Sequence, residues 1–266
     1  MQVGYFQFKP EFGNKKANLR RIADEIKKIN SVDLLVLPEL FNSGYNFESV
    51  VEVELLAEPI PNGKTTELLE QLASKKQFFI VAGIPEEENG LLYNSAVLIG
   101  PEGHIATYRK LHLFAEEKMW FSPGNLPLKV YDIGKAKIGI IICFDWIFPE
   151  ATRVLALGGA DIICHPANLV LPYAQKTMLT RSIENKVFTI TANRIGTENR
   201  GSKPLTFTGQ SQITSPEMEI LSSSGEANEE IVITTINVLL ARNKQVTSQN
   251  HIFEDRRLQF YMDLWK

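Results

Sequence analysis

The sequence has 266 residues, of which 44% are hydrophobic and 22% are charged, so the chain can bury a core of its own. Its formal net charge is −3 and it has no long basic run, which excludes the electrostatic footprint of a nucleic-acid binder. No apolar run could cross a bilayer, no signal peptide is evident, and the two cysteines form no CxxC pair, so we expect a cytoplasmic protein without a membrane partner.

Strands and helices alternate in the first half of the chain. Residues 3–8 alternate as a strand does, and Asn14 can cap a following helix whose apolar residues fall at helical spacing. Short apolar runs predict further strands, and a stripe of leucines predicts a second helix. These predicted segments are strand 34–37, helix 65–74, and strands 78–81, 94–99 and 104–110.

The second half begins with a long irregular stretch, Leu111 to Pro127, and long loops in compact domains are often functional. Lys137 to Ile142 is predicted to be a strand, and Pro149 suits the first position of a helix that Gly158 ends. A helix is predicted over residues 173–185. Further strands are predicted at 161–164, 187–192, 210–214, 219–222 and 231–238.

The order of these elements predicts a single layered α/β domain over residues 1–266. No linker, repeat or low-complexity segment divides the chain. The last part, from about residue 241, is polar but carries late aromatic residues. We expect this tail to pack at a subunit interface, or alternatively on its own domain; its aromatic residues are Phe253, Phe260, Tyr261 and Trp265.

Three polar residues stand where apolar runs end, and active sites of α/β proteins gather beyond the carboxyl ends of strands. Glu39 follows strand 34–37 and Pro38, Lys110 ends strand 104–110, and Cys143 follows strand 137–142. Cys143 would lie at the start of a helix, whose dipole and free N–H groups favour a thiolate. Desolvation of Glu39 would raise its pKa towards the range useful to a general base.

Each of these residues also has an ordinary structural interpretation. Cys143 could be a small buried hydrophobic residue, as Cys164 is expected to be. Lys110 could be a solvated lysine at a strand end, and Glu39 a surface glutamate or a member of an ion pair. The histidines are scattered and no metal-ligand spacing is present, so no metal is predicted. GxSxG, GxGxxG and GxxxxGK motifs are also absent.

The chain resembles the nitrilase (carbon–nitrogen hydrolase) superfamily over nearly its whole length, most closely the aliphatic nitrilases of thermophilic archaea. The resemblance rests on several segments that are weak alone but specific in this order and spacing. They are Leu37-Pro38-Glu39-Leu40-Phe41, Tyr93-Asn94-Ser95-Ala96, Tyr108-Arg109-Lys110-Leu111-His112-Leu113-Phe114, Cys143-Phe144-Asp145-Trp146-Ile147-Phe148-Pro149-Glu150, His165-Pro166-Ala167-Asn168, and Arg181-Ser182-Ile183-Glu184-Asn185 with Ala192-Asn193-Arg194.

The resemblance implies a four-layer α-β-β-α sandwich, dimers or higher homo-oligomers, and a Glu39, Lys110 and Cys143 triad that needs no cofactor. It also implies a second active-site glutamate after the lysine, which Glu117 matches best and for which Glu116 competes. The implied reaction is the hydrolysis of a non-peptide C–N bond in a small nitrile or amide. A cysteine thioester forms on the way, and ammonia and a carboxylic acid are released.

The residues after Cys143 bear on the charge of the substrate. Many family amidases carry an arginine shortly after the cysteine. Here Asp145 supplies a negative charge instead, and the residues that follow it, Trp146, Ile147 and Phe148, supply apolar area. This disfavours carboxylate-anchored substrates such as N-carbamoyl amino acids, unless Arg194 substitutes. The alternatives are an amidase or N-carbamoyl amine amidohydrolase with the same triad, or a catalytically idle binding or assembly member. The predicted pocket wall consists of Tyr45, Phe144, Trp146 and Asn168.

Overall fold

Two six-stranded sheets form the body of the molecule in this computed structural model, which describes residues 1–201 and 203–265, with side chains through residue 263. The first sheet has the strand order β14-β1-β2-β3-β4-β5. Its strands are β1 (Gln2–Gln7), β2 (Leu34–Val36), β3 (Phe79–Glu88), β4 (Leu91–Gly100), β5 (Gly103–Arg109) and β14 (Glu230–Thr235). Strands β1, β2 and β3 are parallel neighbours, and the remaining pairs are antiparallel.

The second sheet repeats this mixed plan, with the order β13-β12-β9-β8-β7-β6. Its strands are β6 (Val130–Asp132), β7 (Lys137–Ile140), β8 (Ile162–Pro166), β9 (Phe188–Ala192), β12 (Gln212–Thr214) and β13 (Ile220–Ser223). The central strands β7, β8 and β9 are parallel. Two small hairpins lie outside the main sheets: β10 (Thr197–Glu198) with β11 (Leu205–Thr206), and β15 (Gln245–Thr247) with β16 (Asn250–His251).

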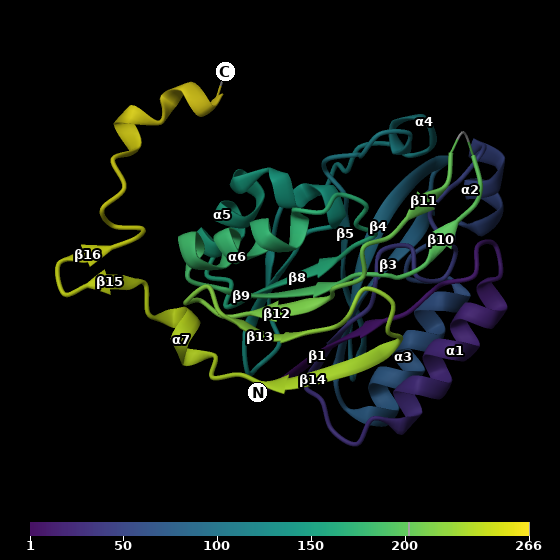
Figure 1. The fold of residues 1–266 in the computed structure, drawn as a ribbon, viewed down its shortest axis with the longest axis horizontal. Helices are drawn as coiled ribbons and strands as arrows, with labels where there is room; N and C mark the ends of the chain where they lie inside the picture. Colours follow the sequence, from purple (N-terminus) through teal and green to yellow (C-terminus); the bar gives the residue numbers. More distant parts are fainter. Residues whose placement is uncertain (202, 266) are drawn as a thin grey trace.

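Helices cover the outer face of each sheet, as Figure 1 shows. Helices α1 (Lys15–Lys28) and α3 (Lys64–Lys76) lie on the first sheet, and α5 (Pro149–Leu157) and α6 (Ala174–Asn185) lie on the second. Asn14 caps α1 as predicted, because its side-chain oxygen accepts a hydrogen bond from the N–H of Ala17. The shorter helices are α2 (Val50–Leu56), α4 (Glu117–Trp120), α7 (Leu239–Arg242), and the 3-10 helices η1 (Cys143–Ile147), η2 (Leu258–Phe260) and η3 (Met262–Trp265).

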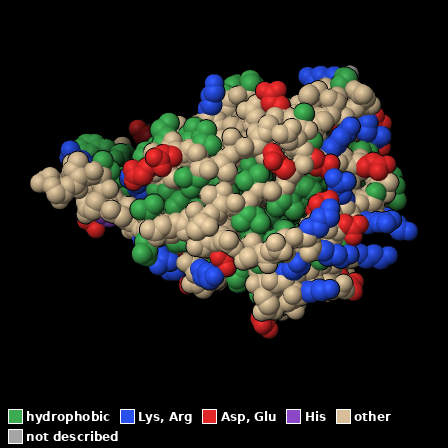
Figure 2. All heavy atoms as spheres, turned by 60° about the horizontal axis from the view of Figure 1, so that its bottom comes forward, with side chains coloured by type: hydrophobic (Ala, Val, Ile, Leu, Met, Phe, Trp, Pro, Cys, Tyr) green, Lys and Arg blue, Asp and Glu red, His purple; other side chains and the backbone are tan. Residues whose placement is uncertain are grey.

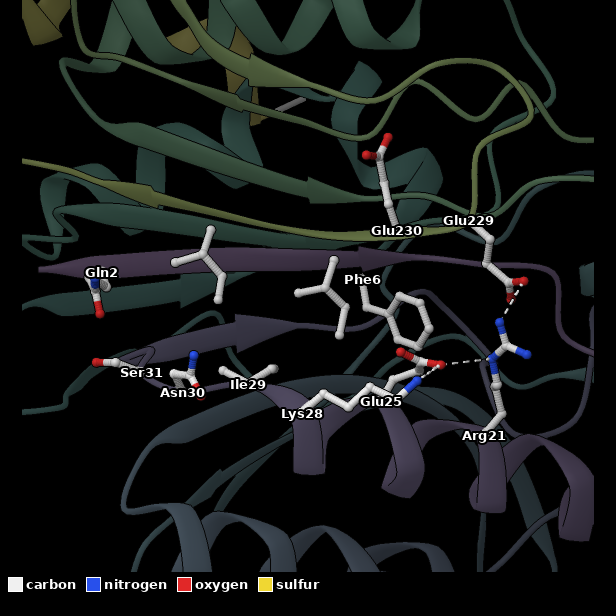
Figure 3. Close-up of a pocket in the computed structure, with 12 residues that line it drawn as sticks. Gln2, Phe6, Arg21, Glu25, Lys28, Ile29, Asn30, Ser31, Glu229 and Glu230 are labelled. Atoms are coloured by element: carbon white, nitrogen blue, oxygen red, sulfur yellow. Dashed lines mark hydrogen bonds and ion pairs between the residues drawn. The ribbon is translucent and has the colours of Figure 1, made fainter.

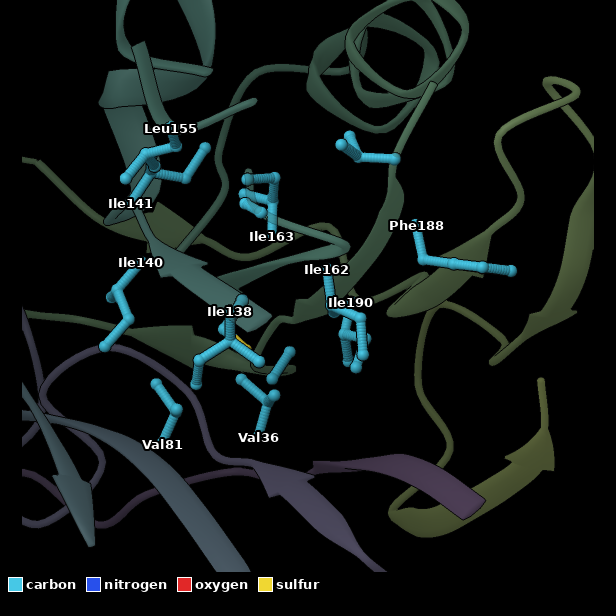
Figure 4. Close-up of a cluster of buried hydrophobic side chains, with 14 of the residues drawn as sticks. Val36, Val81, Ile138, Ile140, Ile141, Leu155, Ile162, Ile163, Phe188 and Ile190 are labelled. Carbon is cyan, nitrogen blue, oxygen red and sulfur yellow. The ribbon is translucent and has the colours of Figure 1, made fainter. Parts of the chain in front are cut away.

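The alternation of side chains along each strand explains the layers. On β2, Leu34 and Val36 point into the core between the two sheets, whereas Leu35 points towards the helices of the first sheet. Figure 4 shows Val36 and Val81 of the first sheet facing Ile138 and Ile140 of the second. The predicted four-layer α-β-β-α sandwich is therefore confirmed.

Several element boundaries differ from the predictions. Strand β3 continues to Glu88, far beyond the predicted end at Val81, because it stays paired with β4 as far as Leu91. The irregular stretch after Lys110 contains the short helix α4, and α2 was not predicted at all. Strand β7 ends at Ile140 rather than Ile142, since the chain bends there into the turn that carries Cys143.

The C-terminal segment from η2 onwards extends away from the sheets as an arm (Figure 1). In the space-filling view of Figure 2, the β15–β16 hairpin and this arm project together at one end of the molecule, and hydrophobic side chains lie on the projection. Leu258, Phe260 and Met262 are mostly exposed there, whereas Phe253, nearer the body, packs against the core. Among the described residues, no helix combines the length and apolar character needed to span a lipid bilayer.

Candidate active site

Glu39, Lys110 and Cys143, which lie far apart in the sequence, meet between the two sheets near the ends of β2, β5 and β7. The Nζ atom of Lys110 lies 2.7 Å from Oε1 of Glu39 and 2.7 Å from Oε1 of Glu117. All four side chains are buried. Cys143 is close enough for the charges of Glu39, Lys110 and Glu117 to act on the pKa of its thiol.

The backbone around Glu39 is held by direct contact with the neighbouring strand β3. A Cβ atom on Gly83 would lie 2.5 Å from the Cα atom of Glu39, so only glycine allows this approach. Gly83 also donates its N–H to the carbonyl of Pro38 and accepts from the N–H of Phe41. The side chain of Asn168 donates to the backbone carbonyl of Glu39 over 2.9 Å.

The two carboxylate oxygens of Glu39 have different environments. Oε1 accepts hydrogen bonds from Lys110 and from the side-chain amide of Asn94, each over 2.7 Å. Oε2 is buried and has no hydrogen-bond partner among the described residues. Burial and the nearby carboxylate of Glu117 raise the pKa of Glu39 despite the opposing effect of Lys110. A carboxylate with one free oxygen and a raised pKa is well suited to accept a proton.

The loop after Lys110 folds back to fix the lysine and Glu117. Gly124 donates its N–H to the Lys110 carbonyl over 2.8 Å. Tyr45 donates its hydroxyl to Oε1 of Glu117 over 2.7 Å, and the N–H of Phe114 donates to the other oxygen over 3.0 Å. Glu117 thus lies in the site, whereas its competitor Glu116 is exposed.

Lys110 is the only cation in contact with this group of described residues. Burial alone would lower the pKa of Lys110, but the carboxylates of Glu117 and Glu39 raise it above its ordinary value. The ammonium group therefore stays charged and supplies a fixed positive charge beside the thiol.

Cys143 occupies a strained turn rather than the start of a long helix. Its φ angle is +40°, in the left-handed region that side chains other than glycine rarely adopt. It begins the five-residue helix η1, and α5 starts only at Pro149. Burial and the charge of Glu39 raise the pKa of the thiol well above its ordinary value. The expected α-helix start at Cys143 is therefore not found, because α5 begins only at Pro149, and burial with the charge of Glu39 favours the thiol over the thiolate.

Asp145 and His165 brace this turn from opposite sides. Asp145 accepts hydrogen bonds from the N–H of Ile142, the hydroxyl of Tyr108, and both the backbone N–H and the ring Nδ1 of His112. The ring Nε2 of His165 lies 3.0 Å from the carbonyl oxygen of Cys143, so it carries the proton and donates. Burial lowers the pKa of His165 to about 4, which keeps the ring neutral.

The sequence had suggested that Asp145 offers a negative charge to the substrate. The structure contradicts this, because the carboxylate is not accessible to a substrate. The side chain is fully buried and its four donors belong to the protein. What the segment does contribute is apolar area. Phe144 and Trp146 line a hollow of about 10 Å³ at Cys143, together with Asn168, so the predicted wall residues Phe144, Trp146 and Asn168 all lie there.

A larger chamber of about 290 Å³ adjoins this hollow, and the two share Phe114, Val170 and Leu171 in their walls. Tyr45, the fourth predicted wall residue, lines the chamber beside Glu117. A separate surface groove of about 670 Å³ lies between α1 and β14 (Figure 3). It shares no lining residue with the site, and its Arg21 is paired with Glu25 and Glu229.

Arg194 does not provide the cation that a carboxylate substrate would need. Its side chain is fully buried, and it donates to Oε1 of Glu198 over 2.5 Å. Its guanidinium group also lies over the ring of Phe207, 4.0 Å from the centroid. Among the described residues, no group of three or more His, Cys, Asp or Glu side chains is placed to hold a metal ion.

Asn94, Gly83 and His165 contribute to the site without having been predicted from their own chemistry. Asn94 and His165 lie within strands whose neighbours decide what these side chains meet. The only signal for Asn94 and His165 was their presence in segments shared with a known family, and Gly83 lies in none of those segments.

Comparisons with known proteins agree with this geometry. A family model described as carbon-nitrogen hydrolase matches residues 2–244. A nitrilase from Pyrococcus abyssi is 48% identical over 98% of this chain and 99% of its own length. An (R)-stereoselective amidase from a Pseudomonas species is 32% identical, over 97% of this chain and 92% of its own. A crystal structure of a carbon-nitrogen hydrolase from Helicobacter pylori G27 superimposes with a TM-score of 0.91 at 26% identity, covering 100% of this chain and 98% of that one.

Proposed function

Because the chain belongs to the carbon–nitrogen hydrolase family, and so hydrolyses C–N bonds other than peptide bonds with release of ammonia, we propose that its substrate is a small uncharged nitrile or amide. We propose further that a thioester forms on Cys143. The observation that carries this proposal is the buried ammonium of Lys110, held between Glu39 and Glu117 beside the thiol.

The first half of the reaction uses the unpaired oxygen of Glu39. Oε2 accepts the proton of Cys143 while the sulfur attacks the amide carbon. Negative charge then develops on the substrate oxygen, where Lys110 and the backbone N–H of Phe144 stabilise it. The C–N bond breaks, the nitrogen takes the proton from Glu39, and ammonia leaves the thioester behind.

The second half regenerates the enzyme. Glu39 takes a proton from water, the hydroxide attacks the thioester carbon, and the C–S bond breaks with return of a proton to the sulfur. With a nitrile, the sulfur first adds across the triple bond to give a thioimidate. One further water adds to the thioimidate, ammonia leaves, and the resulting thioester is hydrolysed as above. Glu117 orients Lys110 in both halves through its 2.7 Å hydrogen bond. These roles require neither a metal nor an organic cofactor.

We also propose a cytoplasmic, homo-oligomeric enzyme. Two unpaired cysteines support a reducing compartment. The projecting arm with exposed Leu258, Phe260 and Met262 supports contact with a second copy of the chain, since isolated apolar arms gain little stability on their own.

Ammonia release across a panel of small nitriles, amides and N-carbamoyl compounds tests this function. We expect turnover of neutral nitriles or amides, and tenfold to a hundredfold lower kcat/KM for an N-carbamoyl amino acid. Arg194 is paired with Glu198, and Lys203 in the chamber lining is exposed to solvent beside Glu116, so neither is placed for a buried pairing with its carboxylate. The absence of ammonia from every compound would contradict the assignment, and preference for the acid would contradict the proposed neutral substrate.

A further inference from the structure

The chamber beside Cys143 is built from apolar side chains, although it lies next to a strongly charged site. Its walls come from three parts of the chain: the segment around Phe47, the loop with Phe114 and Trp120, and the hairpin that carries Leu205. Figure 1 places α2, α4 and the β10–β11 hairpin at the same end of the molecule. Val170 and Leu171 complete the wall where the chamber meets the hollow at Cys143.

A hydrophobic cluster backs this wall and fixes its shape. Tyr45 and Phe47 belong to a buried cluster, and Trp120, Val170 and Leu205 pack against it. The ring of Phe47 also meets that of Phe121 edge to face, with centroids 5.8 Å apart. The chamber is therefore formed before a substrate arrives, and filling it requires no loss of existing apolar contacts.

The polar groups of the chamber are already used within the protein. Tyr45 donates its hydroxyl to Glu117, and Glu117 accepts from Lys110. Asn46 donates its side-chain amide to the carbonyl of Arg200. Two charged residues of opposite sign, Glu116 and Lys203, stand among the lining residues, and both are exposed to solvent. Neither sign of charge on a substrate is therefore favoured by the lining.

From these features we infer that the chamber is an acyl pocket for an uncharged apolar group, either a medium-length alkyl chain or an aryl-alkyl group. This inference rests on the proposed function, because it places the acyl group of a nitrile or amide whose reacting carbon lies at Cys143. A volume of about 290 Å³ is roughly twice that of an apolar cavity that takes up benzene, which fits roughly six to ten carbon atoms.

A matched series of six-carbon substrates tests the inference. Hexanamide, adipamic acid and 6-aminohexanamide have the same length but differ in the charge at the far end, and acetamide lacks the chain. Each is measured as the amide and as the corresponding nitrile. We expect kcat/KM to rise about threefold for each of the four added CH2 groups, hence about eightyfold from acetamide to hexanamide. Both charged compounds should fall at least tenfold below hexanamide.

A variant that narrows the chamber provides the second arm. Leu205→Trp should lower the preference for hexanamide over acetamide at least tenfold, whereas Thr206→Trp, next to it on the exposed face of β11, should keep the wild-type preference. If Leu205→Trp does not fold, Leu205→Ala should instead shift the optimum towards longer or branched acyl groups.

The outcomes separate the two proposals. Ammonia release without a gain from acetamide to hexanamide, a charged six-carbon compound as the better substrate, or an unchanged preference in both Leu205 variants would overturn the acyl pocket while leaving the hydrolase intact. A complete lack of ammonia from every compound would overturn the proposed function, and the acyl pocket with it.

Discussion

At the scale of single residues, the site brings charged side chains of opposite sign together in a buried position. One ammonium group, two carboxylates and a thiol lie together, and each buried charge is stabilised only by its neighbours. Glu39 connects the two parts of the site, because its Oε1 accepts a hydrogen bond from Lys110 and its Oε2 has no partner among the described residues. The hydrogen bond from Asn94 holds Oε1 towards Lys110 and leaves Oε2 free to accept the proton of the thiol, so Asn94 acts as a positioning residue.

Replacing Asn94 should change the pH dependence of catalysis. The hydrogen bond from Asn94 lowers the pKa of Glu39, so Asn94→Ala should raise this pKa further. Glu39 must be ionised to accept a proton, and kcat/KM is therefore lost as the pH falls through its pKa. The acid limb of the pH profile of kcat/KM should move to higher pH in the variant. An unmoved limb in a folded Asn94→Ala protein would show that Asn94 does not act on the base.

His165 gives the stability of the protein a pH dependence of its own. Burial holds the pKa of His165 near 4, against 6.5 for a free imidazole. Between these pH values the unfolded chain binds a proton that the folded protein excludes, so stability declines as the pH falls. The decline amounts to about 3 kcal/mol from this group. His165→Gln keeps a side-chain donor and should flatten the decline in urea unfolding between pH 6.5 and 4; an equal slope in both proteins would refute this.

At the scale of elements, close approach of strands matters more than the strands' own sequences. Strand β3 passes so near to Pro38 and Glu39 that residue 83 must be glycine. The backbone position of Glu39 thus depends on Gly83, although neither the sequence around Gly83 nor the chemistry of a glycine indicates a role in the site. The positions of Glu39, Lys110 and Cys143 were indicated because each follows an apolar run, and because each lies in a segment that resembles a known family. Asn94, Gly83 and His165 were not, because their roles arise only when particular strands become neighbours.

Gly83→Ala tests this dependence. The added methyl group would force β3 away from Glu39, costing about 1–3 kcal/mol of stability and displacing the base. We expect kcat to fall by roughly a hundredfold, as small displacements in an active site commonly cause. Gly225→Ala is the control, since its new Cβ would meet only the side chain of Asn228 at 3.2 Å. Comparable activity of the two variants in ammonia-release assays would argue against the close-approach account.

At the scale of the whole molecule, the order of strands and helices predicted a layered α/β domain, and the resemblance to a known family implied the four-layer sandwich. Runs such as 34–37 and 138–140 bury both faces, which is typical of parallel strands covered on both sides. The strained turn at Cys143 was not predictable, because its φ of +40° depends on contacts with other parts of the fold. Tyr108 and His112 hold Asp145 of the same turn, and His165 on β8 holds the Cys143 carbonyl. The predicted single domain over residues 1–266, with residues 241–266 at an interface, remains a proposal.

The arm is the testable part of that proposal. Deleting residues 254–266, or changing Phe260 and Met262 to serine together, should weaken assembly, because the exposed apolar area would then be lost. Leu55→Ser on α2 removes a leucine that is 76% exposed and should leave assembly unchanged. Light scattering at micromolar concentration provides the measurement, and a monomeric parent chain would refute the homo-oligomer.

The most direct test of the nucleophile compares the two buried cysteines in one assay. Cys143 lies beside Glu39 and Lys110, whereas burial alone raises the pKa of Cys164. Ammonia release should be abolished in Cys143→Ala and retained in Cys164→Ala, with circular dichroism showing that both variants are folded. Full turnover by folded Cys143→Ala would contradict the assignment of Cys143 as the nucleophile.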